Sequence, residues 1–547
     1  MNKHFISLLL VVAMLLSCAC FATASAEQEV MTVTFLNCWH GEVGDWTEEA
    51  MQNNACADFI KEKFGIQFVI SECPQGDEAE YLNMVLASGV VPDMVNHAYW
   101  GDYAGGSGAI AIDAASQGLI KDISSYLPDY ENLNAIYGQG VSVAVNKALF
   151  NNPNFNGGLY FIPVDINFNG DEYATVYGDT LYARADVLEA VGVNAEDITN
   201  LDELYDLLVK IKEAGLKDFN GVNDIIPIST GAQGWRQLNI YEWNHGNNIS
   251  NFRVQEDGSV KYWLFTDEPE LRVNYMRKLI SEGLMDVECF SRNDEDLYAK
   301  VAQGAFAVVA IDSNAAIAWY FDKQDQREGT EWVPLNLTNK DGNNTVDVFQ
   351  PGWTGGHLTW FNADIDEAKL RALLSMIDWF CTEEGYTFNK YGIEGVTFEY
   401  VDGIPTILPE IQEKVDAGEV DLEKDYGVGM FDKLRMADMS QKLWSVPDSM
   451  LSAKDLARKE LDAQFRPRVE VNALSVDDLL KGWDGYEDFV DAISTIDANT
   501  YLNRAYFYTS DEEVTQLIED LRSRFIEAGV EEACQYIQEN LTDEYAF

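Results

Sequence analysis

Aromatic residues at the ends of predicted strands are the part of this sequence best suited to bind a ligand. The chain carries 13 Trp, 26 Tyr and 27 Phe, and many of its Trp lie beside glycine or polar residues. A Trp at the carboxyl end of a strand can project into the crevice above an α/β sheet. Its flat ring can stack on the C–H faces of a sugar, while neighbouring Asp, Asn or His bond the hydroxyls. Burial in a core is the alternative for any single ring, and we expect two or three of the set to line a cleft.

Eight residues form the candidate ligand set. The aromatic rings would stack on a sugar, the aspartates would accept hydroxyl hydrogens, and the histidine could donate or accept. The set is Trp39, His40, Trp100, Asp165, Trp235, Tyr241, Asp312 and Trp353.

Sequence motifs for catalysis are missing. The chain has no GxSxG, HExxH, P-loop or GxGxxG pattern. Its 92 Asp and Glu leave a glycosidase-like carboxylate pair open as an alternative. The cysteines beyond residue 20 are widely spaced and form no CxxC pair, which argues against a zinc site. Spacing alone does not give their disulfide pairing.

Charge excludes other classes of partner. The chain has 37 Lys and Arg against 92 Asp and Glu, a formal net charge of −55. Nucleic-acid binding depends on Lys and Arg that replace counterions on phosphates, so this balance argues against it. It also argues against adhesion of the folded body to an anionic membrane, and it disfavours polyanionic sugars as ligands.

Residues 1–26 are typical of a secretory signal. Lys3 precedes an apolar run that is too short to span a bilayer comfortably. Two processing sites stay open: cleavage after Ala26, or a lipobox at 15–18 in which Cys18 is lipidated. Both predict an extracellular protein, anchored at the cell surface if Cys18 is modified and otherwise secreted. No later stretch has the length and apolar character of a transmembrane helix.

Alternating strands and helices must position the candidate residues. Strands are predicted at 31–39, 66–72 and 91–98, with helices ending near residue 64 and at 78–88. This rhythm predicts a mostly parallel sheet covered by helices. Helical pieces are then expected around 118–127 and 133–149, and a strand at 159–165.

A second α/β block follows. Its best-marked element is a helix at 200–215, which Asn200 caps and Gly215 ends. From about residue 366 the chain is expected to be largely helical, and its last strong helix begins after Ser510. The sequence has no internal repeat or low-complexity linker, so the domains are expected to be interleaved. Other elements of the block are strands at 180–184, 225–229, 305–311, 332–337 and 357–361, a hairpin at 252–265 and a helix at 268–282.

The order of four segments resembles the bacterial ABC-transporter extracellular solute-binding proteins of family 1, particularly the large lipoprotein-type subgroup. No single segment is decisive, but their order over roughly residues 30–410 carries the resemblance. The segments are 86–94 (LASGVVPDM), 181–205 (LYARAD to LDELY), 268–304 (EPE, EGLMD and KVAQG) and 391–405 (YGIEG and DGIP).

The resemblance implies the fold class α/β, in a two-lobe periplasmic-binding-protein-like fold of type II. Its lobes would be discontinuous, joined by hinge strands, with additional C-terminal helices. Lobe 1 would comprise 27–165 and 314–355, and lobe 2 would comprise 166–313 and 356–547. The ligand would favour the closed state of a hinge motion.

The function implied is an extracellular receptor of an ABC importer, which is not an enzyme. It would capture an oligosaccharide or a related carbohydrate and deliver it to membrane permease subunits, and we expect it to be a monomer. A secreted hydrolase, a receptor for a non-sugar solute such as a peptide, and a module reporting to a sensor stay open as alternatives.

The subgroup often carries a calcium loop after the helix that ends near residue 215. The corresponding stretch here is two residues shorter and lacks the regular alternation of oxygen ligands. Asp218, Asn220 and Asp224 are the candidate ligands that remain. We therefore predict that the protein has no cofactor. It would bind a structural calcium ion only if this shortened loop has kept its ligands. The alternative for the loop is a polar turn without a metal ion.

Overall fold

The computed structural model describes most of the chain after residue 29. All structural statements below concern these residues: 30–38, 53–73, 78–98, 107–136, 149–164, 166–167, 178–241, 251–255, 257–338, 347–349, 357–434, 437–438, 443, 446–471, 474–475, 479–480, 482–542 and 545–546.

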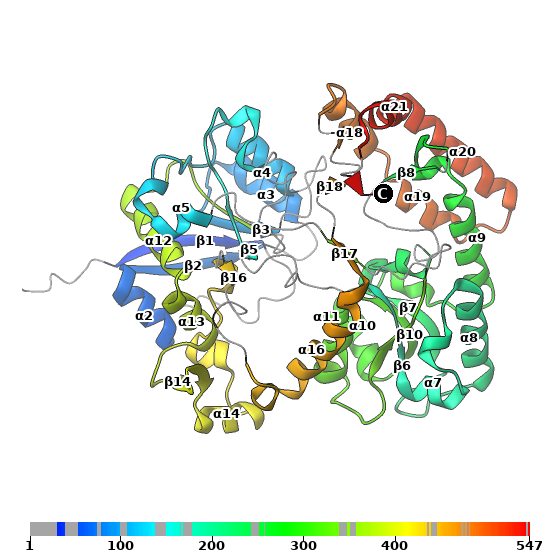
Figure 1. Cartoon of the computed structure of the whole chain (residues 1–547), viewed down its shortest axis with the longest axis horizontal. Coiled ribbons are helices and arrows are strands. Elements are labelled where there is room, and N and C mark those ends of the chain that lie inside the picture. Colours follow the sequence, from blue (N-terminus) through cyan, green and yellow to red (C-terminus); the bar gives the residue numbers. More distant parts are fainter. Residues whose placement is uncertain are drawn as a thin grey trace, which may run out of the picture.

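Two α/β lobes lie side by side, each built around its own sheet (Figure 1). The sheet of the first lobe has the strand order β2-β1-β3-β13-β4. Its first three strands are parallel, and β13 runs antiparallel to both β3 and β4. The strands are β1 (Met31–Asn37), β2 (Ile66–Glu72), β3 (Met94–Ala98), β4 (Ile162–Pro163) and β13 (His357–Phe361).

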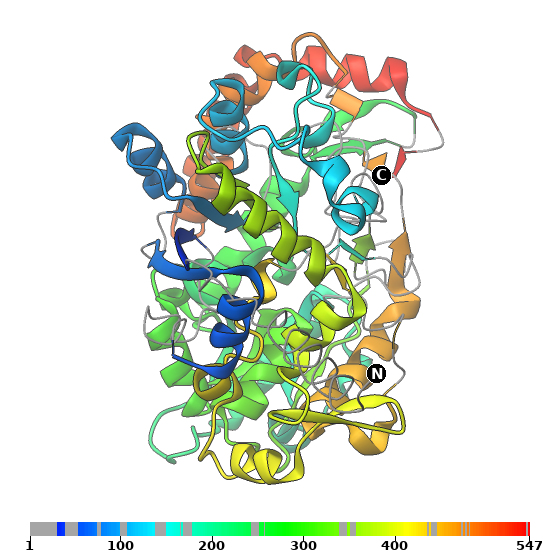
Figure 2. The same ribbon diagram turned by 90° about the vertical axis from the view of Figure 1, so that its left-hand side faces the viewer.

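Helices cover both faces of the first sheet because its strands alternate apolar side chains between two cores. Val33 and Phe35 of β1 face one core, whereas Leu36 faces the other. Figure 2 shows α12 crossing the outer side of this lobe. The helices of this lobe are α2 (Ala55–Phe64), α3 (Glu78–Ser88), α4 (Ser107–Ser116), α5 (Glu131–Ile136), α12 (Glu367–Phe380), α13 (Glu383–Tyr391) and α14 (Pro409–Asp416). A hairpin follows α13 and consists of β14 (Phe398–Val401) and β15 (Ile404–Ile407).

The sheet of the second lobe has the order β11-β6-β10-β7. Strand β10 is parallel to β7 and antiparallel to β6, which in turn is antiparallel to β11. Every residue of β6 and β10 is buried, as expected for strands covered on both faces. The strands are β6 (Thr180–Arg184), β7 (Ile226–Thr230), β10 (Phe306–Ile311) and β11 (Trp332–Pro334), with a separate hairpin of β8 (Phe252–Val254) and β9 (Val260–Tyr262).

Local signals explain the helix boundaries of the second lobe. The Asn200 side chain accepts from the backbone N–H groups of Asp202 and Glu203, and Gly215 ends α8 in the left-handed region. Ser510 likewise caps α20 by accepting from the Glu513 N–H. The helices of this lobe are α7 (Ala185–Val191), α8 (Leu201–Ala214), α9 (Glu268–Ser281), α10 (Asp294–Ala302), α11 (Ser313–Ala318), α16 (Ala453–Phe465), α18 (Tyr486–Ser494), α19 (Ala498–Ala505), α20 (Asp511–Glu527) and α21 (Val530–Asn540).

Helices α18 to α21 extend the core of the second lobe rather than forming a separate domain. Their buried residues, among them Leu502, Ile518 and Ile537, belong to the same apolar cluster as Leu204 and Ile228. The prediction of additional C-terminal helices is therefore confirmed, and Figure 1 shows them along α9 and the β8–β9 hairpin.

The lobe boundaries predicted after residue 313 are wrong. Strand β11 pairs with β6, so 314–338 belong to the second lobe rather than to the first. Strand β13 pairs with β3, and α12 and α13 pack on the first sheet, so 357–434 belong to the first lobe. These boundaries came from the family resemblance, and the apolar runs could not correct them because such a run predicts a strand without indicating which sheet it joins.

Short strand pairs lie where the chain passes between the lobes. The chain crosses between residues 164 and 178, between 338 and 357, and between 434 and 446. Strand β5 (Ile166–Asn167) of the first crossing pairs with β16 (Ala437–Asp438) of the third. Strand β12 (Asp347–Phe349) of the second crossing pairs with β17 (Val469–Val471), which follows α16. The crossing segments are thus tied to one another or to the chain beyond α16.

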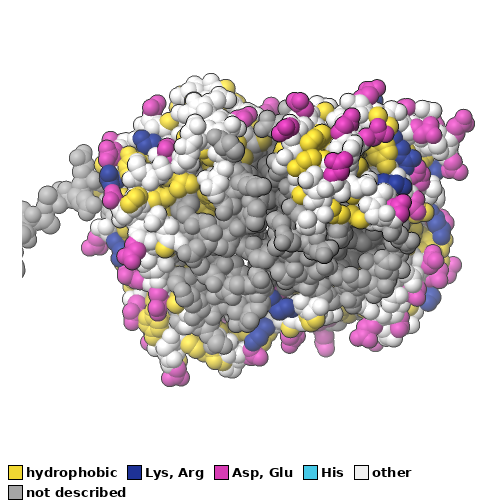
Figure 3. All heavy atoms as spheres, turned by 45° about the horizontal axis from the view of Figure 1, so that its top comes forward, with side chains coloured by type: hydrophobic (Ala, Val, Ile, Leu, Met, Phe, Trp, Pro, Cys, Tyr) yellow, Lys and Arg dark blue, Asp and Glu magenta, His cyan; other side chains and the backbone are white. Residues whose placement is uncertain are grey.

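On the face that Figure 3 shows, acidic side chains are spread over the described parts of both lobes. This distribution agrees with an acidic solvated surface and not with a single acidic site. In the described part of the chain, no helix combines the length and the apolar character that crossing a bilayer requires.

Candidate functional site

Strand register brings four polar or aromatic residues to one edge of the second sheet. Ile311 pairs with Thr180 and Ala310 pairs with Thr230, so the carboxyl ends of β10 and β7 meet the amino end of β6. Asp312 follows β10, Asp179 precedes β6, and Trp235 and Arg236 lie in the loop after β7. Figure 1 places α11, which Asp312 caps, on the side of this lobe that faces the first lobe.

Trp235 presents an exposed ring on a tightly folded loop. Its side chain is 44% exposed, and its backbone carbonyl accepts from the Gly231 N–H at 3.0 Å. The ring lies over Gly231, where an added Cβ would be 2.6 Å from the ring carbon Cε3. Gln233 and Arg236 adopt φ values of 53° and 62°, a region that costs free energy for residues other than glycine. The surroundings must therefore hold this loop in place.

The charged side chains at this edge bond one another or the backbone. The Arg236 guanidinium lies 4.7 Å from the centre of the Trp235 ring, and its Nη2 atom is 3.1 Å from Oδ1 of Asp179. Burial raises the pKa of Asp312, and its bond from the Ala315 N–H and the charges of Arg236 and Arg458 oppose that rise. The site offers an aromatic face bordered by a cation and two carboxyl groups, an arrangement suited to a polyol.

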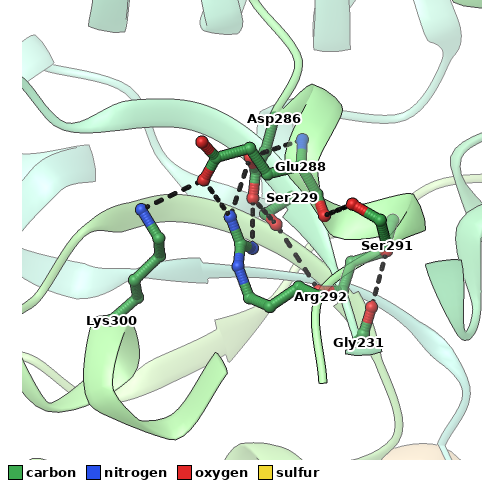
Figure 4. Close-up of polar contacts among 8 residues, drawn as sticks. Ser229, Gly231, Asp286, Glu288, Ser291, Arg292 and Lys300 are labelled. Atoms are coloured by element: carbon green, nitrogen blue, oxygen red, sulfur yellow. Dashed lines mark hydrogen bonds and ion pairs between the residues drawn. The ribbon is translucent and has the colours of Figure 1, made fainter. Parts of the chain in front are cut away.

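A buried ion pair lies beneath the Trp235 loop (Figure 4). The Arg292 guanidinium bonds the Asp286 carboxylate through Nη1 at 2.5 Å and Nη2 at 3.1 Å, and both side chains are 3% exposed. Ser229 of β7 donates its hydroxyl to Asp286 at 2.7 Å. Glu288 accepts from Arg292 at 3.1 Å and lies 3.4 Å from Lys300. The bond from Arg292 and the charge of Lys300 hold the pKa of Glu288 below its ordinary value.

This ion pair is joined to the loop through the backbone. The Arg292 carbonyl accepts from the N–H of Gln233, one of the two strained residues, at 2.9 Å. The ring of Phe290, two residues earlier, comes within 3.1 Å of an added Cβ at Gly234. The segment 286–292 thus supports the loop that presents Trp235.

Buried polar side chains collect at the corresponding edge of the first sheet. Asn37 ends β1, Asn96 and His97 lie near the end of β3, and His357 begins β13. The Asn96 side chain donates to the Thr359 hydroxyl at 2.9 Å. Buried polar groups are nearly always hydrogen-bonded, so these side chains form a polar region at this edge of the sheet.

The structure tests only part of the candidate ligand set. Trp235 and Asp312 lie at the same sheet edge, where Arg236 also pairs with Asp179. Tyr241 is a correction: its side chain is 3% exposed and packs in the core of the second lobe, where burial raises its pKa. Trp39, His40, Trp100, Asp165, Trp353 and the lipidation candidate Cys18 lie outside the described residues.

Arg236 and Asp179 are absent from the candidate ligand set. Arg236 is adjacent to Trp235, and Asp179 immediately precedes a strand whose other end carries Arg184. Proximity to a candidate Trp was the signal available for Arg236. No sequence signal pointed to Asp179, because its place beside Asp312 depends on the antiparallel pairing of β6 with β10.

The stretch predicted as a degenerate calcium loop closes on itself. Oδ1 of Asp218 accepts from the backbone N–H groups of Asn220 and Val222, and Oδ2 accepts from the Asn223 amide. These bonds hold the pKa of Asp218 below its ordinary value. Asp224 instead bonds the Lys217 ammonium at 2.6 Å. Within the described residues, no group of three or more His, Cys, Asp or Glu is placed to hold a metal ion.

Phe219 anchors this loop to the second lobe. Its ring lies 4.5 Å from the guanidinium carbons of both Arg184 and Arg327. It also covers Gly304, where an added Cβ would be 2.7 Å from ring carbons. Cation–π contacts with two guanidinium groups can fix the loop without a metal ion.

The protein has two lobes joined by crossing segments, and polar and aromatic residues lie at the facing sheet edge. These features define a two-lobe binding protein. The family model for the bacterial extracellular solute-binding proteins matches residues 44–369. The chain belongs to this family, as its segment order predicted.

Similar proteins support the same class. Lipoprotein LipO of Bacillus subtilis is 22% identical over 365 residues, which cover 63% of this chain and 64% of LipO. The polygalacturonan/rhamnogalacturonan-binding protein YtcQ of the same species is 24% identical over 342 residues, 60% of each chain. The matched region thus spans less than two thirds of each of these relatives.

A solved structure has the same fold. The ABC-transporter substrate-binding protein FusA of S. pneumoniae, in complex with kestose, aligns with a TM-score of 0.63 at 18% identity. The alignment covers 93% of this chain and 98% of FusA. The two-lobe fold predicted from the sequence is confirmed.

Proposed function

We propose that this protein is the extracellular receptor of an ABC importer and captures a neutral oligosaccharide between its lobes for delivery to a membrane permease. The observation that carries the proposal is the exposed Trp235 ring, which Arg236 contacts, at the end of the sheet that also carries Asp179 and Asp312. An aromatic face beside hydroxyl-bonding groups is the usual way in which proteins hold sugar rings.

The names of similar proteins support a carbohydrate ligand. YtcQ is named as a polygalacturonan/rhamnogalacturonan-binding protein, and the FusA structure contains kestose. The net charge of −55 favours a neutral sugar over an anionic one. We expect binding in the micromolar range, about −8 kcal/mol, and a monomer in solution.

Replacing Trp235 tests the proposed site. With kestose as the first neutral probe, Trp235→Ala should weaken binding at least about 10-fold, because the stacking face is lost. The melting temperature should hardly change, since the ring is nearly half exposed and lies outside the apolar cores. Titration calorimetry and thermal unfolding measure the two effects.

Tyr400→Ala is the matched control, because Tyr400 is a similarly exposed aromatic residue on the β14–β15 hairpin. It should leave binding unchanged. A screen should include other neutral oligosaccharides, oligogalacturonates and peptides. Stabilisation by peptides alone would contradict the carbohydrate proposal, and turnover of a sugar would replace it with the hydrolase alternative.

We also propose that Cys18 anchors the protein at the cell surface. The support is the lipobox-like segment 15–18 and the similarity to a protein named as a lipoprotein. Cells fed labelled palmitate should incorporate label into the protein but not into its Cys18→Ala variant. Unlabelled protein in the culture medium, beginning at Glu27, would instead indicate ordinary cleavage.

A further inference from the structure

Two cysteines lie opposite each other at the ends of neighbouring parallel strands. In the pairing of β1 with β2, Met31 is opposite Ile66 and Asn37 is opposite Glu72. One residue further along each strand, the same register places Cys38 opposite Cys73. The ladder reaches this point, because the Cys73 N–H donates to the Asn37 carbonyl at 3.0 Å.

The two side chains also lie on the same face of the sheet. The opposite pairs Val33–Phe68 and Phe35–Ile70 face the core beneath α2 and α12. Side chains alternate along a strand, so Cys38 and Cys73 face the other side. There both contact the cluster that contains Leu36 and Val95.

This register gives the two cysteines a Cα spacing that a disulfide can bridge. Neighbouring strands lie about 4.8 Å apart, and disulfides join residues whose Cα atoms are about 4.4–6.8 Å apart. The structure holds both residues as cysteine thiols, with Cys38 buried and Cys73 partly exposed. Proteins of an extracellular family work where disulfides form and persist.

We propose that Cys38 and Cys73 form a disulfide in the exported protein. The oxidant is a small-molecule disulfide such as oxidised glutathione. The thiolate of the more accessible Cys73 attacks this disulfide, forms a mixed disulfide and releases one glutathione thiolate. Cys38 then loses its proton and attacks the Cys73 sulfur, which releases the second glutathione. Two protein thiols are oxidised to one disulfide, and one oxidised glutathione is reduced to two thiols.

The other described cysteines occupy different surroundings. Burial raises the pKa of Cys56 and of Cys289 to about 12, and of Cys534 to about 11. Burial also raises the pKa of Cys381. Cys38 is buried as well, so strand register, and not thiol pKa, distinguishes the Cys38–Cys73 pair from these cysteines.

The disulfide would hold two strands of the first lobe together at the edge that faces the ligand. It would join the carboxyl ends of β1 and β2 and close the segment that contains α2 (Figure 1). Residues 39 and 40, both in the candidate ligand set, follow Cys38 directly. The inference is independent of the proposed ligand, because it rests on strand register alone.

Peptide mapping of the full chain tests the bond without any substitution. After equilibration with oxidised glutathione, blocking of remaining thiols and proteolysis, mass spectrometry should find one peptide pair linking Cys38 to Cys73. Its mass should be about 2 Da below the sum of the reduced peptides, and reduction should abolish it. Recovery of both cysteines as blocked thiols, or a bond from either one to another cysteine, would overturn the proposal.

A stability comparison gives a second measurement. Oxidation should raise the unfolding midpoint by several degrees, because the bond restricts the unfolded chain. Cys73→Ser should remove this rise, whereas Cys534→Ser, at a partly buried cysteine of the second lobe, should preserve it. An equal rise in the Cys73→Ser variant would contradict the assignment.

Discussion

Arg292→Met should lower the free energy of unfolding by about 3–5 kcal/mol, a large share of a typical domain's stability. The substitution leaves the Asp286 carboxylate buried without its cation, with the Ser229 hydroxyl and the Glu288 N–H still donating to it. The uncompensated charge, more than the lost pair, accounts for the size of the effect. Urea unfolding at neutral pH measures it.

Two further variants separate this cause from general damage to the lobe. Lys300→Met removes a half-exposed partner of the same network and should cost less than about 1 kcal/mol. The double variant Asp286→Leu with Arg292→Met removes both buried charges and should recover much of the stability lost by Arg292→Met. Losses that simply add in the double variant would show that the explanation by an uncompensated charge is wrong.

Phe219→Ala should lower the free energy of unfolding by about 2–4 kcal/mol, the second largest effect we expect. The ring contacts two guanidinium groups and covers Gly304, so its removal leaves both Arg184 and Arg327 without their aromatic partner. The loop that the family resemblance associates with calcium would then lose its attachment to the lobe. Thermal and urea unfolding measure the change.

Val222→Ala is the matched control in the same loop, because Val222 is exposed and should contribute less than about 0.5 kcal/mol. We also expect a chelator to leave the melting temperature of the unmodified protein unchanged. Destabilisation by a chelator, reversed by added calcium, would indicate that Asp218 and its neighbours bind the ion after all.

Much of the fold could be predicted because local patterns specify local elements. The strands at 66–72, 180–184 and 357–361 have the bounds that their apolar runs predicted. A helix at 118–127 was wrong: α4 occupies Ser107–Ser116, where small residues such as Ala111 and Ala114 pack. Helix α4 has few polar residues, so its sequence lacks the alternation of polar and apolar faces that predicts a helix.

The candidate site was less predictable because it depends on pairing between distant segments. Trp235 and Asp312 could be proposed, since each follows a recognisable strand. Asp179 becomes part of the site only through the antiparallel pairing of β6 with β10. Tyr241 follows a short turn and packs inward, and nothing in its neighbouring residues distinguished it from a ligand-facing ring.

The interleaved order of the lobes has a consequence for the newly made chain. Synthesis delivers β1, β2 and β3 early, yet β13, α12 and α13 of the same lobe come only after residue 356. Until then the apolar face that includes Phe35 and Phe68 lacks its covering helix α12. Exposed apolar faces and strand edges aggregate readily. The first lobe therefore has to finish folding late, after most of the second lobe has emerged, and a chain ending before residue 357 could complete neither lobe.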